Sequence, residues 1–485
     1  METIRNPEQT SMLEFEKSAA WKNLSPGDLS FSFPQSIAGD VESAVANASA
    51  VMAGWARTSL AERIERLREA QRAIAAAKEE LAHGIALETG KPITEAQGEV
   101  GAVIAKIDLT IEDAGSHLAE RTGLGGPHPS LVRQAPRGPA VVIGPFNFPL
   151  HLGHGANVAH LLAGNPVIYK PSPLAANVAA KYGRIMETAF PGGVFQLVQG
   201  GGVEGSALCL DPRIRAICFT GSVPVGRELA RKLAGDFSKD LALELGGGNA
   251  LIVCADADLD EAARAAAEGA CLTAGQRCNA TSRVIVERSV AAGFEKKFLE
   301  ALAVFEPGDP LLAATKLGPL VSAAAVARYE RLLGEMPGDW LLRGRTEPIV
   351  AGKRGYWVRP AVIHREDGRA DDAECFVPIV SYFIAEDLAH AVRLHSTTPF
   401  GLTASVFTRS EETFRRLGAE LEVGNLYANL PTTFSPSTLP FGGWRDSGNS
   451  RPGGRGFIRY TTREQAVQWK GFFSKTSPNG TPDPA

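Results

Sequence analysis

A cysteine, a carboxylate and an amide, far apart in the sequence, are the residues of this chain best suited to covalent chemistry. Cys278 follows a glycine-bearing stretch, Leu272-Thr-Ala-Gly-Gln-Arg, that could present its thiol to a cleft. Only the thiolate form of cysteine is an effective nucleophile, so covalent catalysis at Cys278 would also need a base. A lone cysteine can equally be a small buried apolar residue. On this residue alone both interpretations stay open.

Glu244 is the candidate for that base. It stands in the apolar stretch Leu243-Glu-Leu, directly before three glycines. Loss of hydration would raise the pKa of such a carboxyl group and suit it to general-base catalysis near neutral pH. A salt-bridged or helix-capping glutamate fits the same pattern equally well.

Asn147 lies in the segment Pro145-Phe-Asn-Phe-Pro, where two prolines fix a turn after an apolar run. Its side-chain amide could donate a hydrogen bond to an oxygen that becomes negative during a reaction. An asparagine that merely stabilises a turn is the alternative.

The segment from Phe219 to Gly226 predicts a strand that passes through Gly221 and Ser222 into a helix. Free N–H groups at such a helix start favour a phosphate group. The segment lacks the full glycine fingerprint of dinucleotide sites, so by itself it is a weak indication.

The elements that must position these residues alternate between helices and strands. Apolar residues at helical spacing, such as Leu60, Ile64, Leu67 and Ile74, predict amphipathic helices between about Val41 and Leu118. Further helices are expected at Leu174–Ala189 and Leu259–Ala274. Short apolar runs predict strands at Leu131–Gln134, Ala140–Ile143, Pro166–Lys170, Val194–Val198, Ile214–Phe219, Asn249–Cys254, Ser282–Val286, Val377–Ile384 and Arg463–Lys470. This alternation predicts α/β sheets with a ligand crevice at the carboxyl ends of the strands.

Composition narrows the class of protein. The 485 residues imply two to four lobes, and 44% hydrophobic with 21% charged residues are values of a soluble globular chain. A net charge of −4 without basic runs argues against a nucleic-acid partner, and no apolar run approaches the ~20 residues of a membrane span. Six cysteines without a C-x-x-C pair and a polar N-terminus predict a cytoplasmic protein.

No metal site is predicted. His151, His154 and His160 could share a helix, but carboxylate and cysteine partners are absent, so we interpret them as helix-surface or tunnel-lining residues. Cys271, two helical turns before Cys278, is expected to be a packing residue, with a disulfide between the two as the alternative.

The order and spacing of these segments resemble the aldehyde dehydrogenase superfamily. Glu244 and Cys278 are 34 positions apart (278 − 244), the interval expected in that family. The resemblance covers roughly Val41 to Lys470 and is carried by Phe146-Asn147, Lys170, Gly221, Gly226, Glu244, Cys278, Glu374-Cys-Phe and Pro440-Phe-Gly-Gly-Trp-Arg-Asp-Ser-Gly.

The resemblance implies NAD(P)-dependent oxidation of an aldehyde to a carboxylic acid through a cysteine thioester. Cys278 would be the nucleophile and Glu244 the base for hydrolysis. We expect Glu244 or an intervening water to accept the proton of the thiol as well. Asn147 and the backbone N–H of Cys278 would form the oxyanion hole. NAD or NADP would be held by Phe146, Lys170, Ser172, Gly221, Ser222, Gly226, Glu244, Leu245, Glu374 and Phe376. Among these, Lys170 would bind the ribose of the adenosine half, Ser222 the pyrophosphate, and Glu374 the nicotinamide ribose.

The fold that the resemblance implies is the aldehyde dehydrogenase fold: a doubly wound cofactor lobe, an α/β catalytic lobe and a small β bridging element. The expected NAD(P)-binding domain comprises residues 1–121 and 140–246, and the catalytic domain residues 247–445. Residues 122–139 and 461–485 would form the bridging element, and 446–460 a return segment. An exposed strand edge in the bridge predicts a homodimer or a dimer of dimers.

Three departures from the family pattern stand out. Pro173 replaces a Glu that many NAD-preferring relatives carry. Without that carboxylate nothing there repels the 2′-phosphate of NADP, so either cofactor could bind; the alternative is that the replacement has no effect on cofactor choice. Val377 replaces a usual Gly, so the turn at Phe376 is expected to differ. The residues before Val41 do not show the usual extended hairpin.

The substrate is the least defined part of the prediction. The element Ser447-Gly-Asn-Ser-Arg-Pro and its neighbours are similar to succinylglutamate semialdehyde dehydrogenases of arginine breakdown, and Arg451 could meet a substrate carboxylate. Another aliphatic or aromatic aldehyde is the alternative. Less favoured rivals are a CoA-acylating enzyme, against which Glu244 argues, and an inactive binding protein on the same fold.

Overall fold

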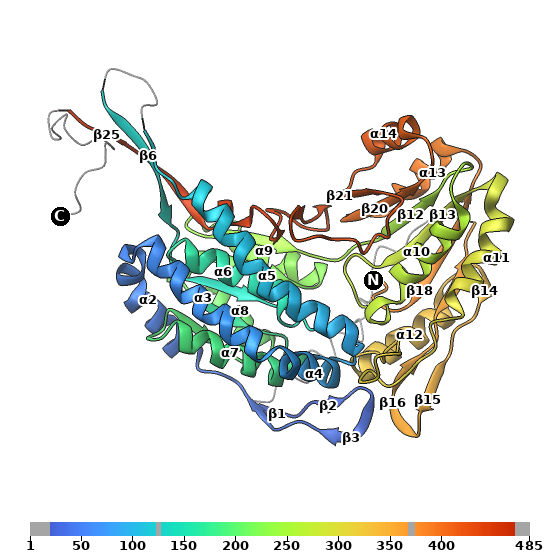
Figure 1. The fold of residues 1–485 in the computed structure, drawn as a ribbon, viewed down its shortest axis with the longest axis horizontal. Helices are drawn as coiled ribbons and strands as arrows, with labels where there is room; N and C mark the ends of the chain where they lie inside the picture. Colours follow the sequence, from blue (N-terminus) through green and yellow to red (C-terminus); the bar gives the residue numbers. More distant parts are fainter. Residues whose placement is uncertain (1–19, 123–127, 367–373, 471–485) are drawn as a thin grey trace.

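The computed structural model describes residues 20–122, 128–366 and 374–470. Within these ranges the chain forms two α/β bodies side by side and a narrow β-sheet that projects from the first of them (Figure 1). The expected α/β class is confirmed. The expected C-terminal tail and most of the Gly/Pro-rich break after Thr122 lie outside the described residues.

Short paired strands precede the first helix. β1 (Ala20–Trp21) pairs with β4 (Ser36–Ile37), and β2 (Leu24–Ser25) pairs with β3 (Asp28–Ser32), all antiparallel. The expectation that this region lacks a hairpin is therefore wrong. These strands are too short for an alternating pattern to reveal them, and the Pro26-Gly27 turn signal was their only mark in the sequence.

Four helices form the expected helical block: α2 (Val41–Arg57), α3 (Leu60–Ala76), α4 (Lys78–Thr89) and α5 (Ile93–His117). Asp40 and Ser59 cap α2 and α3 by accepting the backbone N–H of the residue three positions later, Ser43 and Glu62 respectively. Leu67 and Ile74 are fully buried in the first core, as the helical spacing predicted.

The first body is built on a five-stranded parallel sheet of order β11-β10-β7-β8-β9. Its strands are β7 (Ala140–Ile143), β8 (Val167–Lys170), β9 (Phe195–Leu197), β10 (Ala216–Thr220) and β11 (Asp240–Glu244). Its connecting helices are α6 (His151–Leu162), η1 (Pro173–Ala175), α7 (Ala176–Ala189), α8 (Gly202–Leu210) and α9 (Val223–Leu233). Ile143 pairs with Lys170, and Thr220 with Glu244, so the carboxyl ends of these strands share one edge.

The second body contains a seven-stranded sheet of order β14-β17-β18-β13-β12-β20-β21, in which only β14 is antiparallel to its neighbour. Its strands are β12 (Asn249–Val253), β13 (Thr281–Glu287), β14 (Asp339–Leu342), β17 (Ala361–His364), β18 (Ile379–Ala385), β20 (Thr403–Phe407) and β21 (Asn425–Ala428). The helices are α10 (Leu259–Cys271), η2 (Leu272–Gly275), η3 (Arg288–Val290), α11 (Ala291–Leu302), α12 (Ala323–Glu335), α13 (Leu388–His395) and α14 (Glu411–Glu420).

Smaller strand pairs complete the fold. They are β15 (Thr346–Val350) with β16 (Lys353–Val358), β19 (Phe400–Gly401) with β23 (Trp444–Arg445), and β22 (Pro440–Phe441) with β24 (Gly453–Gly454). The projecting sheet joins β5 (Arg121–Thr122), β6 (Ser130–Pro136) and β25 (Thr462–Gln468), the last following η4 (Phe457–Tyr460). Among the described residues, no helix is both long and apolar enough to cross a bilayer.

A buried carboxylate on α4 joins the N-terminal strands to the first body. Glu88 is 1% exposed, and it accepts hydrogen bonds from Asn23 Nδ2 (2.8 Å) and from the backbone N–H groups of Asn177 (3.0 Å) and Val178 (2.8 Å) at the start of α7. Burial raises the pKa of this carboxyl group, and the hydrogen bonds oppose that rise.

We expect Glu88→Ala to lower the free energy of unfolding by about 3 kcal/mol, because several buried donors lose their acceptor at once. The matched control is Glu80→Ala on the same helix, which removes a largely exposed ion pair with Lys181 and should leave the midpoint close to that of the wild type. Denaturant midpoints of the two variants give the comparison. Equal midpoints would contradict a structural role for Glu88.

Candidate active site

Cys278 lies in the loop between η2 and β13, at the junction of the two bodies. Its carbonyl oxygen accepts a hydrogen bond (2.8 Å) from the side-chain Nδ2 of Asn249, which is the first residue of β12. A Cβ atom at Gly247 would lie 2.4 Å from that same carbonyl oxygen. The backbone after Glu244 therefore approaches the cysteine loop so closely that only glycine fits, and the three glycines predicted as a domain change act here as a packing surface.

The chain bends sharply just before this loop. α10 ends at Cys271, and Thr273 and Ala274 then adopt left-handed φ angles of 52° and 53°. The predicted helix through Ala274 is thus three residues too long. Glu95 on α5 explains the difference, because it accepts hydrogen bonds from Thr273 N (3.1 Å) and Thr273 Oγ1 (2.7 Å) and so pulls the backbone out of helical geometry. Cys271 packs in the core as a free thiol.

Glu244 is the last residue of β11 and is 1% exposed. Within the described ranges neither of its carboxyl oxygens has a well-formed hydrogen-bond partner. Desolvation raises the pKa of Glu244 to about 8; the nearby Glu374 carboxylate adds to the rise, and the Cys278 thiol opposes it. The predicted raised pKa is confirmed in direction, and desolvation is the largest cause.

The Cys278 thiol shares this environment. Part of the residue's surface stays open to solvent, yet protein atoms surround the thiol closely enough that burial raises its pKa well above the usual value. The negative charges of Glu244 and Glu374 raise that pKa further, while Arg277 lowers it. A thiol in this state needs a neighbouring proton acceptor before it can react.

The segment after β23 holds Glu244 in place. Leu245 N donates to Ser447 O (3.0 Å), and Ser447 Oγ donates to Gly246 O (2.7 Å). Asn449 bonds to both backbone groups of Leu243, through its N–H (2.9 Å) and its Oδ1 (2.8 Å). Sequence reasoning assigned the motif 440–448 to the neighbourhood of the site but missed Ser447 and Asn449 as the residues that fix the Glu244 backbone.

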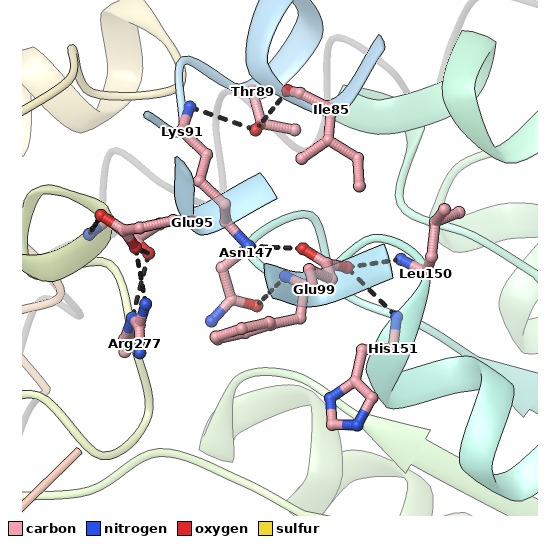
Figure 2. Close-up of polar contacts among 11 residues, drawn as sticks. Ile85, Thr89, Lys91, Glu95, Glu99, Asn147, Leu150, His151 and Arg277 are labelled. Carbon is pink, nitrogen blue, oxygen red and sulfur yellow. Dashed lines mark hydrogen bonds and ion pairs between the residues drawn. The ribbon is translucent and has the colours of Figure 1, made fainter. Parts of the chain in front are cut away.

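Asn147 lies between β7 and α6 and is 2% exposed. Its Oδ1 accepts a hydrogen bond from Phe148 N (3.1 Å), an arrangement that commits the amide oxygen and leaves the NH₂ group as the available donor (Figure 2). The guanidinium of Arg277 lies 5.0 Å from the centroid of the Phe148 ring. The neighbours of Asn147 and of Cys278 are thus in contact.

The predicted cofactor residues lie at the carboxyl edge of the first sheet and opposite it. Burial lowers the pKa of Lys170 to about 8, and its Nζ donates to Pro171 O (3.3 Å). Ser172 caps η1 by accepting Leu174 N, whereas Ser222 stands at the start of α9 without a side-chain bond to that helix. Gly221 N donates to Glu244 O (3.1 Å).

Gly226 and Leu245 pack together, because a Cβ at Gly226 would lie 2.7 Å from the Leu245 side chain. On the opposite side, Glu374 Oε1 accepts Gly247 N (3.2 Å), and burial raises the pKa of Glu374 to about 8. The rings of Phe146 and Phe376 meet edge to face at 5.9 Å. Phe376 carries a left-handed φ of 54°, so the strained residue of this turn is Phe376 itself and not the neighbouring Val377.

Two of the three histidines of α6 differ from the prediction, while His151 stays partly exposed. His154 and His160 are buried (0% and 2% exposed), and His154 Nδ1 is 2.8 Å from Tyr182 Oη, so these two residues belong to the core and not to a surface or tunnel. Their alanine- and glycine-rich surroundings gave no sign of this burial. In the ranges that the structure covers, no three His, Cys, Asp or Glu residues are grouped as metal ligands would be.

Several dehydrogenases are similar in sequence to this chain over most of its length. It is 35% identical to N-succinylglutamate 5-semialdehyde dehydrogenase 1 of Caulobacter vibrioides over 434 residues, which cover 88% of this chain and 91% of that protein. It is 33% identical to human 4-trimethylaminobutyraldehyde dehydrogenase over 439 residues, 88% of each chain.

Solved structures agree with the fold. A 1-pyrroline-5-carboxylate dehydrogenase from Thermus with bound NAD matches with a TM-score of 0.87 and 28% identity, over 96% of this chain and 98% of that one. The glyceraldehyde-3-phosphate dehydrogenase GapN from Methanocaldococcus jannaschii, complexed with NADP, matches with a TM-score of 0.84 and 26% identity, over 93% and 99%.

The family model for the aldehyde dehydrogenase family matches residues 16–467. Together with the dehydrogenases above, this match identifies the reaction as oxidation of an aldehyde with NAD or NADP as the cofactor. The chain belongs to the aldehyde dehydrogenase family.

Proposed function

We propose that this enzyme oxidises its aldehyde through a thioester on Cys278 and that Glu244 activates the water that hydrolyses the thioester. The observation that carries the proposal is the state of Glu244. Its carboxyl group is buried against the Cys278 thiol, neither of its oxygens has a well-formed hydrogen bond among the described residues, and burial raises its pKa to about 8. A carboxyl group that titrates near the working pH can both accept and release a proton.

Cys278 Sγ, once deprotonated, attacks the aldehyde carbon, and the carbonyl oxygen becomes negative. The amide of Asn147 and the backbone N–H of Cys278 donate hydrogen bonds to that oxygen. The chemistry that a bound nicotinamide supplies is acceptance of a hydride from the same carbon, which leaves a thioester. Glu244 then takes a proton from water, the water oxygen attacks the thioester carbon, the C–S bond breaks, and the carboxylic acid is released.

The residues at the edge of the first sheet fit a dinucleotide. Lys170 is a buried ammonium whose hydrogen bond in the described structure goes to its own neighbour's carbonyl, and Ser222 leaves the start of α9 uncapped by its side chain. Lys170 and Ser172 would bind the ribose of the adenosine half. Gly221, Ser222 and Gly226 would meet the pyrophosphate at the helix start. Phe146, Leu245, Glu374 and Phe376 would hold the nicotinamide end.

We assign residues 1–121 and 140–246 to the NAD(P)-binding domain, 247–445 to the catalytic domain, 122–139 and 461–485 to a bridging element, and 446–460 to a return segment. The five-stranded and seven-stranded sheets support the first two ranges. β25 lies at the outer edge of the projecting sheet with most of its side chains exposed. Such an edge favours pairing with a second copy, as a homodimer or a dimer of dimers.

For the substrate we propose N-succinylglutamate 5-semialdehyde. The identity to the Caulobacter enzyme and the Ser447-Gly-Asn-Ser-Arg-Pro element support it. Two residues of that element also have contacts that stabilise the fold. Asn449 fixes the Leu243 backbone, and Arg451 donates to Gly424 O (3.0 Å) and lies over the Trp444 ring. The human relative, named for a cationic aldehyde, makes 4-trimethylaminobutyraldehyde the alternative.

We expect Glu244→Gln to keep the amplitude of the burst of reduced cofactor at about one per active site, with water accepting the thiol proton, while steady-state kcat falls ~10²–10⁴-fold because the base for hydrolysis is lost. In the wild-type enzyme kcat should rise with pH and level off above about 8, since Glu244 acts as a base only when ionised. Stopped-flow absorbance at 340 nm measures both quantities. The control Cys278→Ala should show no burst. Full turnover by the Gln variant at pH 7, or turnover that requires coenzyme A, would refute the role.

A comparison of aldehydes tests the substrate. We expect kcat/KM for N-succinylglutamate 5-semialdehyde to exceed that for 4-trimethylaminobutyraldehyde at least ~10-fold, a difference of about 1.4 kcal/mol in transition-state binding. The two compounds have opposite charge, so the ratio of their kcat/KM values should fall at high salt, which screens the electrostatic attraction between enzyme and substrate. A preference for the cationic aldehyde would replace our proposal by the alternative.

The cofactor preference depends on Pro173. This residue begins η1, and its carbonyl accepts Trp21 Nε1 (3.1 Å) and Asn23 Nδ2 (2.9 Å), so it brings no negative charge near the adenosine ribose. We expect kcat/KM for NADP to lie within ~10-fold of that for NAD, and Pro173→Glu to weaken NADP selectively because like charges repel. Steady-state kinetics with both cofactors decides this. A large NAD preference in the wild type would contradict it.

A further inference from the structure

We propose that Glu95 and Glu99, one turn apart on α5, are positioning residues that set the separation between the two arms of the oxyanion hole, the Asn147 amide and the Cys278 backbone N–H. The proposal rests on the function proposed above for those two donors. Figure 2 shows the two carboxylates reaching from one helix toward opposite sides, Glu95 toward Arg277 and Glu99 toward the start of α6.

Glu99 fixes the Asn147 arm. Its Oε1 accepts the backbone N–H groups of Leu150 (3.0 Å), the residue before α6, and His151 (3.1 Å), the first residue of α6. Its Oε2 binds Lys91 Nζ at 2.5 Å, and neither side chain of this pair is exposed. A carboxylate from another helix thus takes the place of the N-cap that α6 lacks in its own sequence. Asn147 lies three residues before Leu150, so its position follows the position of this cap.

Glu95 fixes the Cys278 arm. It binds both the N–H and the hydroxyl of Thr273, and its Oε2 forms an ion pair with Arg277 (2.6 Å). Arg277 Nε donates in turn to Thr273 Oγ1 (3.0 Å). The side chains of Glu95 and Arg277 are only 11% and 12% exposed, so water competes little with these contacts. The residue directly before Cys278 is therefore tied to α5 by a closed ring of bonds.

The two arms meet at Phe148. Lys91 Nζ lies 3.9 Å from the centroid of its ring, and the Arg277 guanidinium lies 5.0 Å from it. The side chain next to Asn147 is thus contacted by a cation from each arm, an attractive arrangement for an aromatic ring. Since both glutamates stand on one helix and both carboxylates are held by several bonds, the spacing of their backbone positions cannot change without bending α5. A displacement of the donors by about 1 Å can cost ~100-fold in rate, so this rigidity bears directly on kcat.

The first experiment separates capping of α6 from burial of charge. Lys91→Met is combined with Glu99→Gln in one variant and with Glu99→Leu in another. Neither variant contains the buried ion pair, but only Gln offers an oxygen to the N–H groups of Leu150 and His151. We expect kcat of the Gln variant to exceed that of the Leu variant at least ~10-fold, with KM for the cofactor alike. Equal kcat values in two folded variants would overturn the proposal for Glu99.

The second experiment asks which arm each glutamate serves. Glu99→Gln and Glu95→Ala are each made alone and with Asn147→Ala, and the burst rate at 340 nm is measured. The Glu99 effect should fall below ~3-fold in the Asn147→Ala background, because the donor that it positions is gone, while the Glu95 effect should persist. Glu99 and Glu95 effects that both persist unchanged would show general destabilisation and not positioning. If Glu99→Gln alone does not fold, the matched pair with Lys91→Met decides.

Asp108→Asn serves as the control on the same helix, because Asp108 forms an exposed ion pair with Arg68 far from the site. It should leave the burst rate within ~2-fold of the wild type. Failure of the proposed function is recognised separately: Asn147→Ala would then leave the burst rate unchanged. A large loss in Asn147→Ala together with none in Glu99→Gln, Glu95→Ala and the matched pair would reject only the positioning role.

Discussion

The site depends on how closely two backbone segments approach one another. Between Glu244, the last residue of β11, and Asn249, the first of β12, the chain passes the carbonyl oxygen of Cys278 at a distance that admits no side chain at Gly247. A Cβ at Gly246 would likewise lie 2.5 Å from Glu374 Oε2. The same short stretch therefore connects the two sheets, places the carboxylate of the first against the thiol of the second, and leaves room for neither to move away.

Desolvation outweighs charge pairing in this environment. The pKa of Glu244 and that of Glu374 rise to about 8, and that of the Cys278 thiol also rises, although Arg277 and Arg328 oppose two of these changes. The positive groups nearby are largely committed elsewhere, Arg277 to Glu95 and Lys91 to Glu99. Burial therefore favours the protonated form of each of these acidic groups in the resting site.

Local pattern was enough to predict most of the frame. The apolar runs became β7, β8, β10, β12, β13 and β18, and the carboxylate in the apolar stretch at Glu244 has the raised pKa expected of it. The misses arose from contacts between residues far apart in the sequence. Thr273 leaves helical geometry because of Glu95, 178 positions away, and α6 is capped by Glu99, 51 positions away. No periodicity records such pairings, and two-residue strands such as β1 and β4 leave no periodic signal either.

The hydrogen bonds from α5 also restrict how the molecule can move. This helix packs with α3, α4 and α6 in the first body, while Glu95 is bonded to Thr273 and Arg277 in the second. Ser447 and Asn449 tie the end of β11 to the segment that follows β23. A hinge-like separation of the two bodies would have to break the bonds on both sides of the junction at once. These contacts therefore favour exchange of cofactor and product through rearrangement of side chains and short loops over opening of the whole interdomain junction.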